Sequence, residues 1–74
     1  MTEQQNNIYS ILKKMGPLSQ HGVIHAMKAV QQYTSPSGIR SRMSELERIG
    51  WIKKTDDYER TPAGRRAYLY KAVV

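Results

Sequence analysis

The spacing of the apolar residues changes at Gly50, and this change constrains the fold more than any other feature of the chain. Before Gly50 the apolar residues recur at intervals of three and four, which is the pattern of helices that bury one face. Residues 51–74 are instead rich in aromatic and β-branched side chains, which favour strands. Glycine and proline at residues 16–17 and 36–38 divide the helical part into three segments. The sequence therefore predicts an α+β fold, with three helices followed by strands.

The first two predicted helices each have a start signal and one apolar face. Thr2 and Gln5 have capping-box spacing ahead of a helix from about Glu3 to Met15, which Gly16 ends. Ser19 can cap a second helix by accepting a hydrogen bond from an N–H of its first turn. The expected buried residues are Ile8, Ile11, Leu12 and Met15 in the first helix, and Val23, Ile24, Met27 and Val30 in the second.

The third predicted helix begins with Ser35 as its cap and Pro36 in its first turn, and it ends at Gly50. Its apolar face consists of Ile39, Met43, Leu46 and Ile49. The opposite face carries Ser37, Ser41, Ser44 and Arg48, with Arg40 on one flank. A helix that only faces water usually carries long charged residues that support one another. The small outward side chains predict close approach to another surface.

Residues 51–74 permit two readings. In the first, "WIKKT" and "AYLYKAVV" form a two-stranded hairpin around a long basic tip. In the second, shorter strands at 51–54 and 57–61 precede a fourth helix capped by Thr61, with Pro62 in its first turn. The inward face of that helix would consist of Ala63, Ala67, Tyr70 and Val74. The side chains expected in the core, rather than on a platform for stacking bases, are Trp51, Tyr68, Leu69 and Tyr70.

The chain is basic, and its charge is unevenly placed. It has 12 lysines and arginines against 6 acidic residues, with a pI near 9.9, and every arginine lies in residues 38–74. A polyanion is the natural partner of such a surface.

Length and composition exclude several other classes of protein. The 74 residues fit one domain, Met1 to Val74, with a small core. The absence of cysteine excludes disulfides, thiolate metal sites and cysteine nucleophiles. The polar amino terminus does not resemble a signal peptide, and no apolar run is long enough to span a membrane. We therefore expect a soluble, cytoplasmic protein with no membrane partner.

The outward face of the third helix suits the major groove of double-stranded DNA, which is wide enough to admit a helix. The residues expected to meet base edges are Ser37, Arg40, Ser41 and Ser44, and Arg40 can make a bidentate contact with guanine. The N–H groups near Pro36 to Gly38 can receive a phosphate. Arg48 complements the helix dipole, whereas Arg42 is expected to pair with Glu45 or Glu47.

The order of these elements and the run "SPSGIRSRMSELERIGWI…GRRAYLYKA" resemble the winged helix-turn-helix family, in particular its small phage-type members. The similarity covers roughly Gly16 to Ala72. It implies a third helix in the major groove and a hairpin, the wing, on the DNA backbone or in the minor groove. At the matching positions it implies wing contacts from Arg60, Arg65 and Arg66. The full candidate DNA-binding set is Ser35, Ser37, Gly38, Arg40, Ser41, Ser44, Arg48, Lys53, Lys54, Arg60, Arg65 and Arg66.

These features predict a phage or prophage transcriptional regulator that binds double-stranded DNA, with a homodimer as a possible assembly. Two alternatives stay open: a winged-helix interaction module that inhibits or redirects a host protein, and an excisionase-like or replication accessory protein. His21 and His25 have the spacing of a zinc pair, but no further ligands are evident. Since no catalytic arrangement is recognisable either, we expect no enzyme activity, metal or cofactor.

Overall fold

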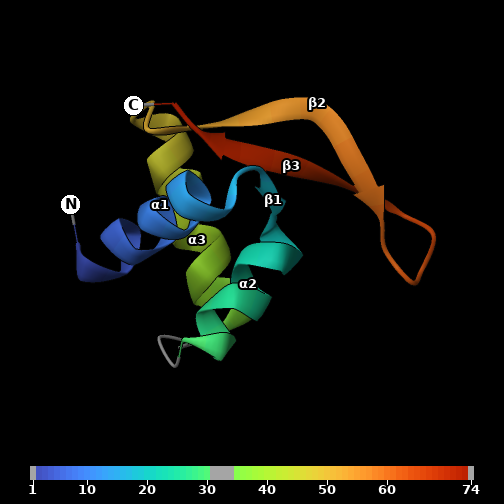
Figure 1. Cartoon of the computed structure of the whole chain (residues 1–74), viewed down its shortest axis with the longest axis horizontal. Helices are drawn as coiled ribbons and strands as arrows, with labels where there is room; N and C mark the ends of the chain where they lie inside the picture. The colour runs from blue at the N-terminus through green and yellow to red at the C-terminus, as the bar shows by residue number, and fades with distance from the viewer. Residues whose placement is uncertain (1, 31–34, 74) are drawn as a thin grey trace.

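The computed structural model describes residues 2–30 and 35–73, which form three helices and a three-stranded sheet. In chain order the elements are α1 (Glu3–Met15), β1 (Leu18–Ser19), α2 (Gln20–Ala29), α3 (Pro36–Arg48), β2 (Ile52–Arg60) and β3 (Arg66–Ala72). The helices pack together beside one end of the sheet, and the β2–β3 hairpin projects away from them (Figure 1). The predicted α+β class is confirmed. Within the described ranges, no helix is long and apolar enough to cross a membrane.

Each helix starts at the cap that the sequence predicts. The Thr2 hydroxyl accepts from the N–H of Gln5, whose side-chain oxygen accepts in return from the N–H of Thr2. The hydroxyls of Ser19 and Ser35 each accept an N–H from the third residue onward, at 3.0 Å. These caps pair backbone donors that an α-helix leaves unbonded at its start, so local chemistry alone fixes where the helices begin.

The core lies between the helices and the base of the sheet. Its buried side chains are Ile8, Leu12, Val23, Ile24, Met27, Ile39, Met43, Leu46 and Ile52. Trp51 and Tyr70 pack against this cluster, as predicted, and the Trp51 ring meets Tyr9 edge-on with centroids 5.2 Å apart. Tyr68 and Leu69 are half-buried farther along the hairpin and do not join the core of the described chain.

Three apolar residues predicted to be buried are exposed instead. Met15 is 62% exposed, Val30 52% and Ile49 56%. Met15 is the last residue of α1, and Val30 and Ile49 are the C-caps of α2 and α3. The predicted stripe is therefore wrong at its last member in each helix, because the neighbouring elements do not cover the helix ends.

The sheet is antiparallel with the strand order β1-β3-β2, so β3 is the central strand. The two-residue strand β1 pairs Leu18 with Tyr70 and Ser19 with Leu69. So short a strand has no periodicity, and the sequence does not predict it. Because residues 66–72 form a strand that pairs with β2 along its length and with β1 at Leu69 and Tyr70, the alternative that placed a fourth helix there is wrong.

Strand β2 is longer than predicted and is bent by a β-bulge. Its pairing with β3 jumps from Lys54 opposite Tyr70 to Tyr58 opposite Tyr68. Inside the bulge, the Thr55 hydroxyl donates to the carbonyl of Leu69 at 2.9 Å and accepts from an N–H two residues onward at 3.2 Å. Bulges increase the local bend and twist of a strand, and β2 visibly arches before the tip (Figure 1). We call residues 58–68, beyond this bend, the outer wing.

The tip of the hairpin is short and is closed by Thr61. The Thr61 N–H donates to the carbonyl of Arg65 at 2.9 Å, and its hydroxyl accepts from the N–H of Arg65 at 3.2 Å. Gly64, at φ +82°, donates to the Thr61 carbonyl at 2.8 Å, and few other residues adopt that backbone conformation. Thr61 thus closes a turn and does not cap a helix. Val74, predicted to end the last strand, lies outside the described residues.

Candidate nucleic-acid interface

The outward face of α3 is arranged as the sequence predicts. Its exposed residues include Ser37, Arg40, Ser41, Ser44 and Arg48. Arg48 is eight residues beyond Arg40, about 12 Å along the axis at the rise of an α-helix. The amino-terminal part of this face therefore consists of small side chains around one arginine, and Arg48 is separate from it.

The first turn of α3 is partly occupied by its own cap. The Gly38 N–H donates to the Ser35 hydroxyl at 3.0 Å, and Pro36 has no N–H. Of residues 36–38, only the N–H of Ser37 is left to receive a phosphate. The Ser35 hydroxyl accepts in this cap, so its own proton can still be donated to an anion.

Arg42 has the structural role that the sequence predicts. Its Nε is buried and lies 3.4 Å from Oε1 of Glu45, close enough for an ion pair but not aligned as a hydrogen bond. The same oxygen accepts a 2.6 Å hydrogen bond from Nε2 of Gln5. Arg42 therefore faces α1, on the other flank of α3 from Arg40.

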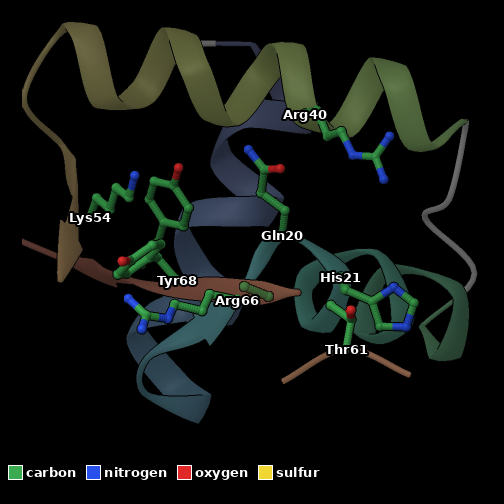
Figure 2. Close-up of a pocket in the computed structure, with 9 residues that line it drawn as sticks. Gln20, His21, Arg40, Lys54, Thr61, Arg66 and Tyr68 are labelled. Atoms are coloured by element: carbon green, nitrogen blue, oxygen red, sulfur yellow. The ribbon is translucent and has the colours of Figure 1, made fainter. Parts of the chain in front are cut away.

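A groove of about 280 Å³ lies between α3, the start of α2 and the hairpin. Its lining residues are Gln20, His21, Arg40, Lys54, Thr61, Arg66, Ala67, Tyr68 and Tyr70. In Figure 2, Arg40 extends into the groove from α3, while Lys54 and Arg66 come from the two strands of the hairpin. Among the described residues none that lines this groove is acidic, so it concentrates positive charge from three elements.

Aromatic rings hold the two hairpin cations of this groove in place. The Lys54 Nζ lies 4.5 Å from the centroid of the Tyr68 ring, and the Arg66 guanidinium lies 4.9 Å from that of Tyr58. The two tyrosines face each other across the strands with centroids 5.7 Å apart. Cation–π contacts of this kind are worth about 0.5–1 kcal/mol at exposed sites. Since cations already cover these rings, the pair is a support for charges and not an open platform for bases.

The remaining wing cations lie apart from the groove. Arg60 donates from Nη1 to the carbonyl of Gly64 at 3.2 Å, so it braces the tip. Arg65 is exposed in the tip, and no side-chain partner is found for it among the described residues. Lys53 pairs with Lys71 and lines a different groove, together with Asp56 and Asp57.

Several groove residues were not in the predicted set. Gln20 and His21 follow the cap of α2. A position in the first turn of that helix lets the sequence suggest a phosphate contact for His21, and the same signal could have identified Gln20. Burial, and secondarily the nearby Glu47 carboxylate, raises the pKa of Tyr70, so its hydroxyl stays a neutral donor at physiological pH. No group of three or more potential metal ligands was found in the described ranges.

The chain matches no known family model and no curated protein. It is similar to the crystal structure of transcriptional regulator PA4135, with a TM-score of 0.67 and 22% sequence identity. The similarity covers 99% of this chain and 47% of that chain, so this chain spans about half the length of the solved protein. Together with the three helices and the antiparallel hairpin, the match confirms the predicted winged helix-turn-helix fold.

Proposed function

We propose that this chain binds double-stranded DNA and regulates transcription. The observation that carries the proposal is the basic groove, which is lined by Arg40 of α3 and by Lys54 and Arg66 of the hairpin, with no acidic residue in its lining in the described part of the chain. A surface of this charge, shared between a helix and a projecting hairpin, fits the phosphate backbone of a duplex. The solved structure of similar fold is described as a transcriptional regulator, which supports the same class of function.

In this proposal, the amino-terminal half of α3 enters the major groove. Ser37, Ser41 and Ser44 allow the helix backbone to approach closely, and their hydroxyls can donate to or accept from base edges. Arg40 makes the bidentate contact with guanine, and its position at the rim of the basic groove leaves it beside the backbone as well. Arg40 therefore contributes most of the sequence preference, whereas the serines allow the approach.

The wing cations act on the backbone and the minor groove in different ways. Lys54 and Arg66, held by tyrosines in the basic groove, neutralise backbone phosphates. Arg65, exposed at the tip, is the residue placed to enter the minor groove. Arg60 supports the tip in which Arg65 lies. Lys53 and Arg48 lie away from the groove, and we propose only peripheral phosphate contacts for them.

The sequence resemblance and the size of the chain support two further parts of the proposal: the kind of regulator and its assembly. The similarity to small phage-type winged helices favours a phage or prophage regulator. One module of this size buries limited DNA surface, so we propose that two copies bind one operator to reach useful specificity.

Selection of duplex DNA from a random pool at physiological salt tests this function. We expect one motif to be enriched, and we expect Arg40→Ala to relax the preference at one guanine of that motif. A charge-matched control, Arg42→Ala, removes an arginine from the opposite flank of α3 and should leave the motif unchanged. If no motif is enriched and one host protein is instead bound stoichiometrically, the interaction-module alternative replaces this proposal. A strongly bent complex would indicate the architectural role instead.

A further inference from the structure

We propose that Glu59 is a positioning residue, which fixes the outer wing against the start of α2 and thereby sets the width of the basic groove. An acidic side chain in a DNA-binding wing is unexpected, because it repels phosphate. The proposal gives this carboxylate a function, and its link to DNA rests on the function proposed above.

The contact itself is short and involves a buried hydroxyl. Oγ of Ser19 donates to Oε1 of Glu59 at 2.6 Å, the length typical of a hydrogen bond to a charged acceptor. Oγ of Ser19 also accepts from the N–H of Gly22 at 3.0 Å, as the cap of α2. Ser19 is only 1% exposed, so loss of Glu59 would leave a buried donor without this partner.

The contact joins elements that are far apart in sequence. Ser19 is the last residue of β1 and pairs with Leu69 of β3, whereas Glu59 lies on β2 and pairs with Ala67. The hydrogen bond therefore reaches from one edge strand, past the central strand, to the other edge strand. Glu59 also lies beyond the bulge in β2, on the outer wing, where the hairpin has left the helices (Figure 1).

Neither partner lines the groove itself, but each is directly adjacent to lining residues. Gln20 and His21, which line the groove from α2, directly follow Ser19, while Ala67, which lines it from β3, pairs with Glu59 across the strands. The hairpin can bend at the bulge, because the hydrogen bonds between β2 and β3 are interrupted there. A side-chain contact beyond that point limits this bending, so the distance between the hairpin and α2 across the groove depends on it.

A distance measurement on the free protein tests the positioning directly. The chain has no cysteine, so His25→Cys on α2 and Ala63→Cys at the wing tip, both exposed, place two spin labels without competing sites. We expect Glu59→Ala to shift or broaden the label-to-label distance by more than about 2 Å, the scale of a genuine rearrangement. Glu59→Gln keeps an oxygen acceptor for Ser19 and should keep the original distribution.

DNA binding by the same variants separates positioning from charge repulsion. We expect Glu59→Ala to weaken cognate binding roughly ten-fold, as loss of one hydrogen bond to a charged group would, and Glu59→Gln to bind at least as tightly as the parent. If Glu59 acted only as a repelling charge, both variants would bind more tightly. Asp56→Ala, which removes an acid from the bulge, is the matched control and should leave the distance unchanged.

The outcomes distinguish this proposal from the proposed function. An unchanged distance in Glu59→Ala overturns the positioning role, whatever happens to DNA binding. Failure of the parent protein to bind any duplex overturns the DNA function but leaves the distance result standing. Circular dichroism checks that each variant is folded, and Glu59→Thr, too short to reach Ser19, replaces the alanine variant if that one unfolds.

Discussion

The outward face of α3 and the outer wing are both basic and exposed, but they hold their side chains in different ways. The face of α3 is supported from behind by Ile39, Met43 and Leu46, each at most 1% exposed. The outer wing has no such core behind it in the described structure, and its cations are held by rings and carbonyls instead. A helix face can therefore be positioned by burial alone, whereas a projecting hairpin needs contacts between its own surface side chains.

The largest expected effect is on the support of α3. Leu46 is fully buried, so Leu46→Ala should lower the free energy of unfolding by about 2–5 kcal/mol, measured by urea denaturation. Ile49→Ala, at an exposed position three residues onward, is the control and should cost well under this amount. Equal losses at the two positions would mean that the exposed end of the stripe is packed after all.

The second effect is on the proposed recognition of a specific DNA site by α3. Arg40→Ala should weaken binding to the selected site by about 1–3 kcal/mol and leave binding to random DNA nearly unchanged, as measured by fluorescence anisotropy. Equal losses on selected and random DNA would mean that Arg40 contacts the DNA backbone and not a base. The helix and the wing would then not differ in the kind of contact they make.

The third effect concerns the wing cations. Alanine at Arg65 or at Arg66 should reduce the slope of log affinity against log salt by about one, because each removes one positive charge from the DNA-contacting surface. Tyr58→Leu removes the ring beside Arg66 but no charge, so it should weaken binding by about 0.5–1 kcal/mol with little change of slope. An unaltered slope in both arginine variants would exclude the wing from the contact surface.

The smallest expected effect is on the pH dependence of stability. It comes from Tyr70, a half-buried residue of the hairpin that packs against the core. Because the pKa of Tyr70 is raised in the folded state, folding favours its protonated form. The resulting stability is fully present below about pH 10, the ordinary pKa of tyrosine, and is lost as pH rises through the raised value. Thermal melts should therefore fall more steeply above pH 10 for the parent than for Tyr70→Phe. Parallel curves would place the Tyr70 hydroxyl in free contact with water.

Local signals made the helical half of this protein predictable. The caps at Thr2, Ser19 and Ser35 and the apolar spacing between them are sequence-local features, and each helix begins at its predicted cap. The pairing of Arg42 with Glu45 followed from spacing of the same kind.

The hairpin half was less predictable, because its bounds depend on partners distant in sequence. "DDYER" resembles a loop by composition, yet residues 56–60 continue β2 because β3 lies beside them and Thr55 stabilises the bulge. Likewise, Thr61 and Pro62 satisfy the rules for a helix start, but residues 66–72 are central to the sheet. The local helix signal is therefore outweighed by the pairing of β3 with a strand on each side.

By itself, the sequence determined three capped helices, most of each buried face, the basic character of residues 51–74 and the small-residue face around Arg40; it left a hairpin and a fourth helix as alternatives. Only the tertiary structure decided which cations share a surface: Arg40, Lys54 and Arg66 line one groove, while Lys53 and Arg48 are not among its lining residues. The physical reason is range. Capping and amphipathic spacing act within a few residues. The Ser19–Glu59 hydrogen bond joins residues 40 positions apart, the groove also joins separate elements, and sequence spacing carries no record of such contacts.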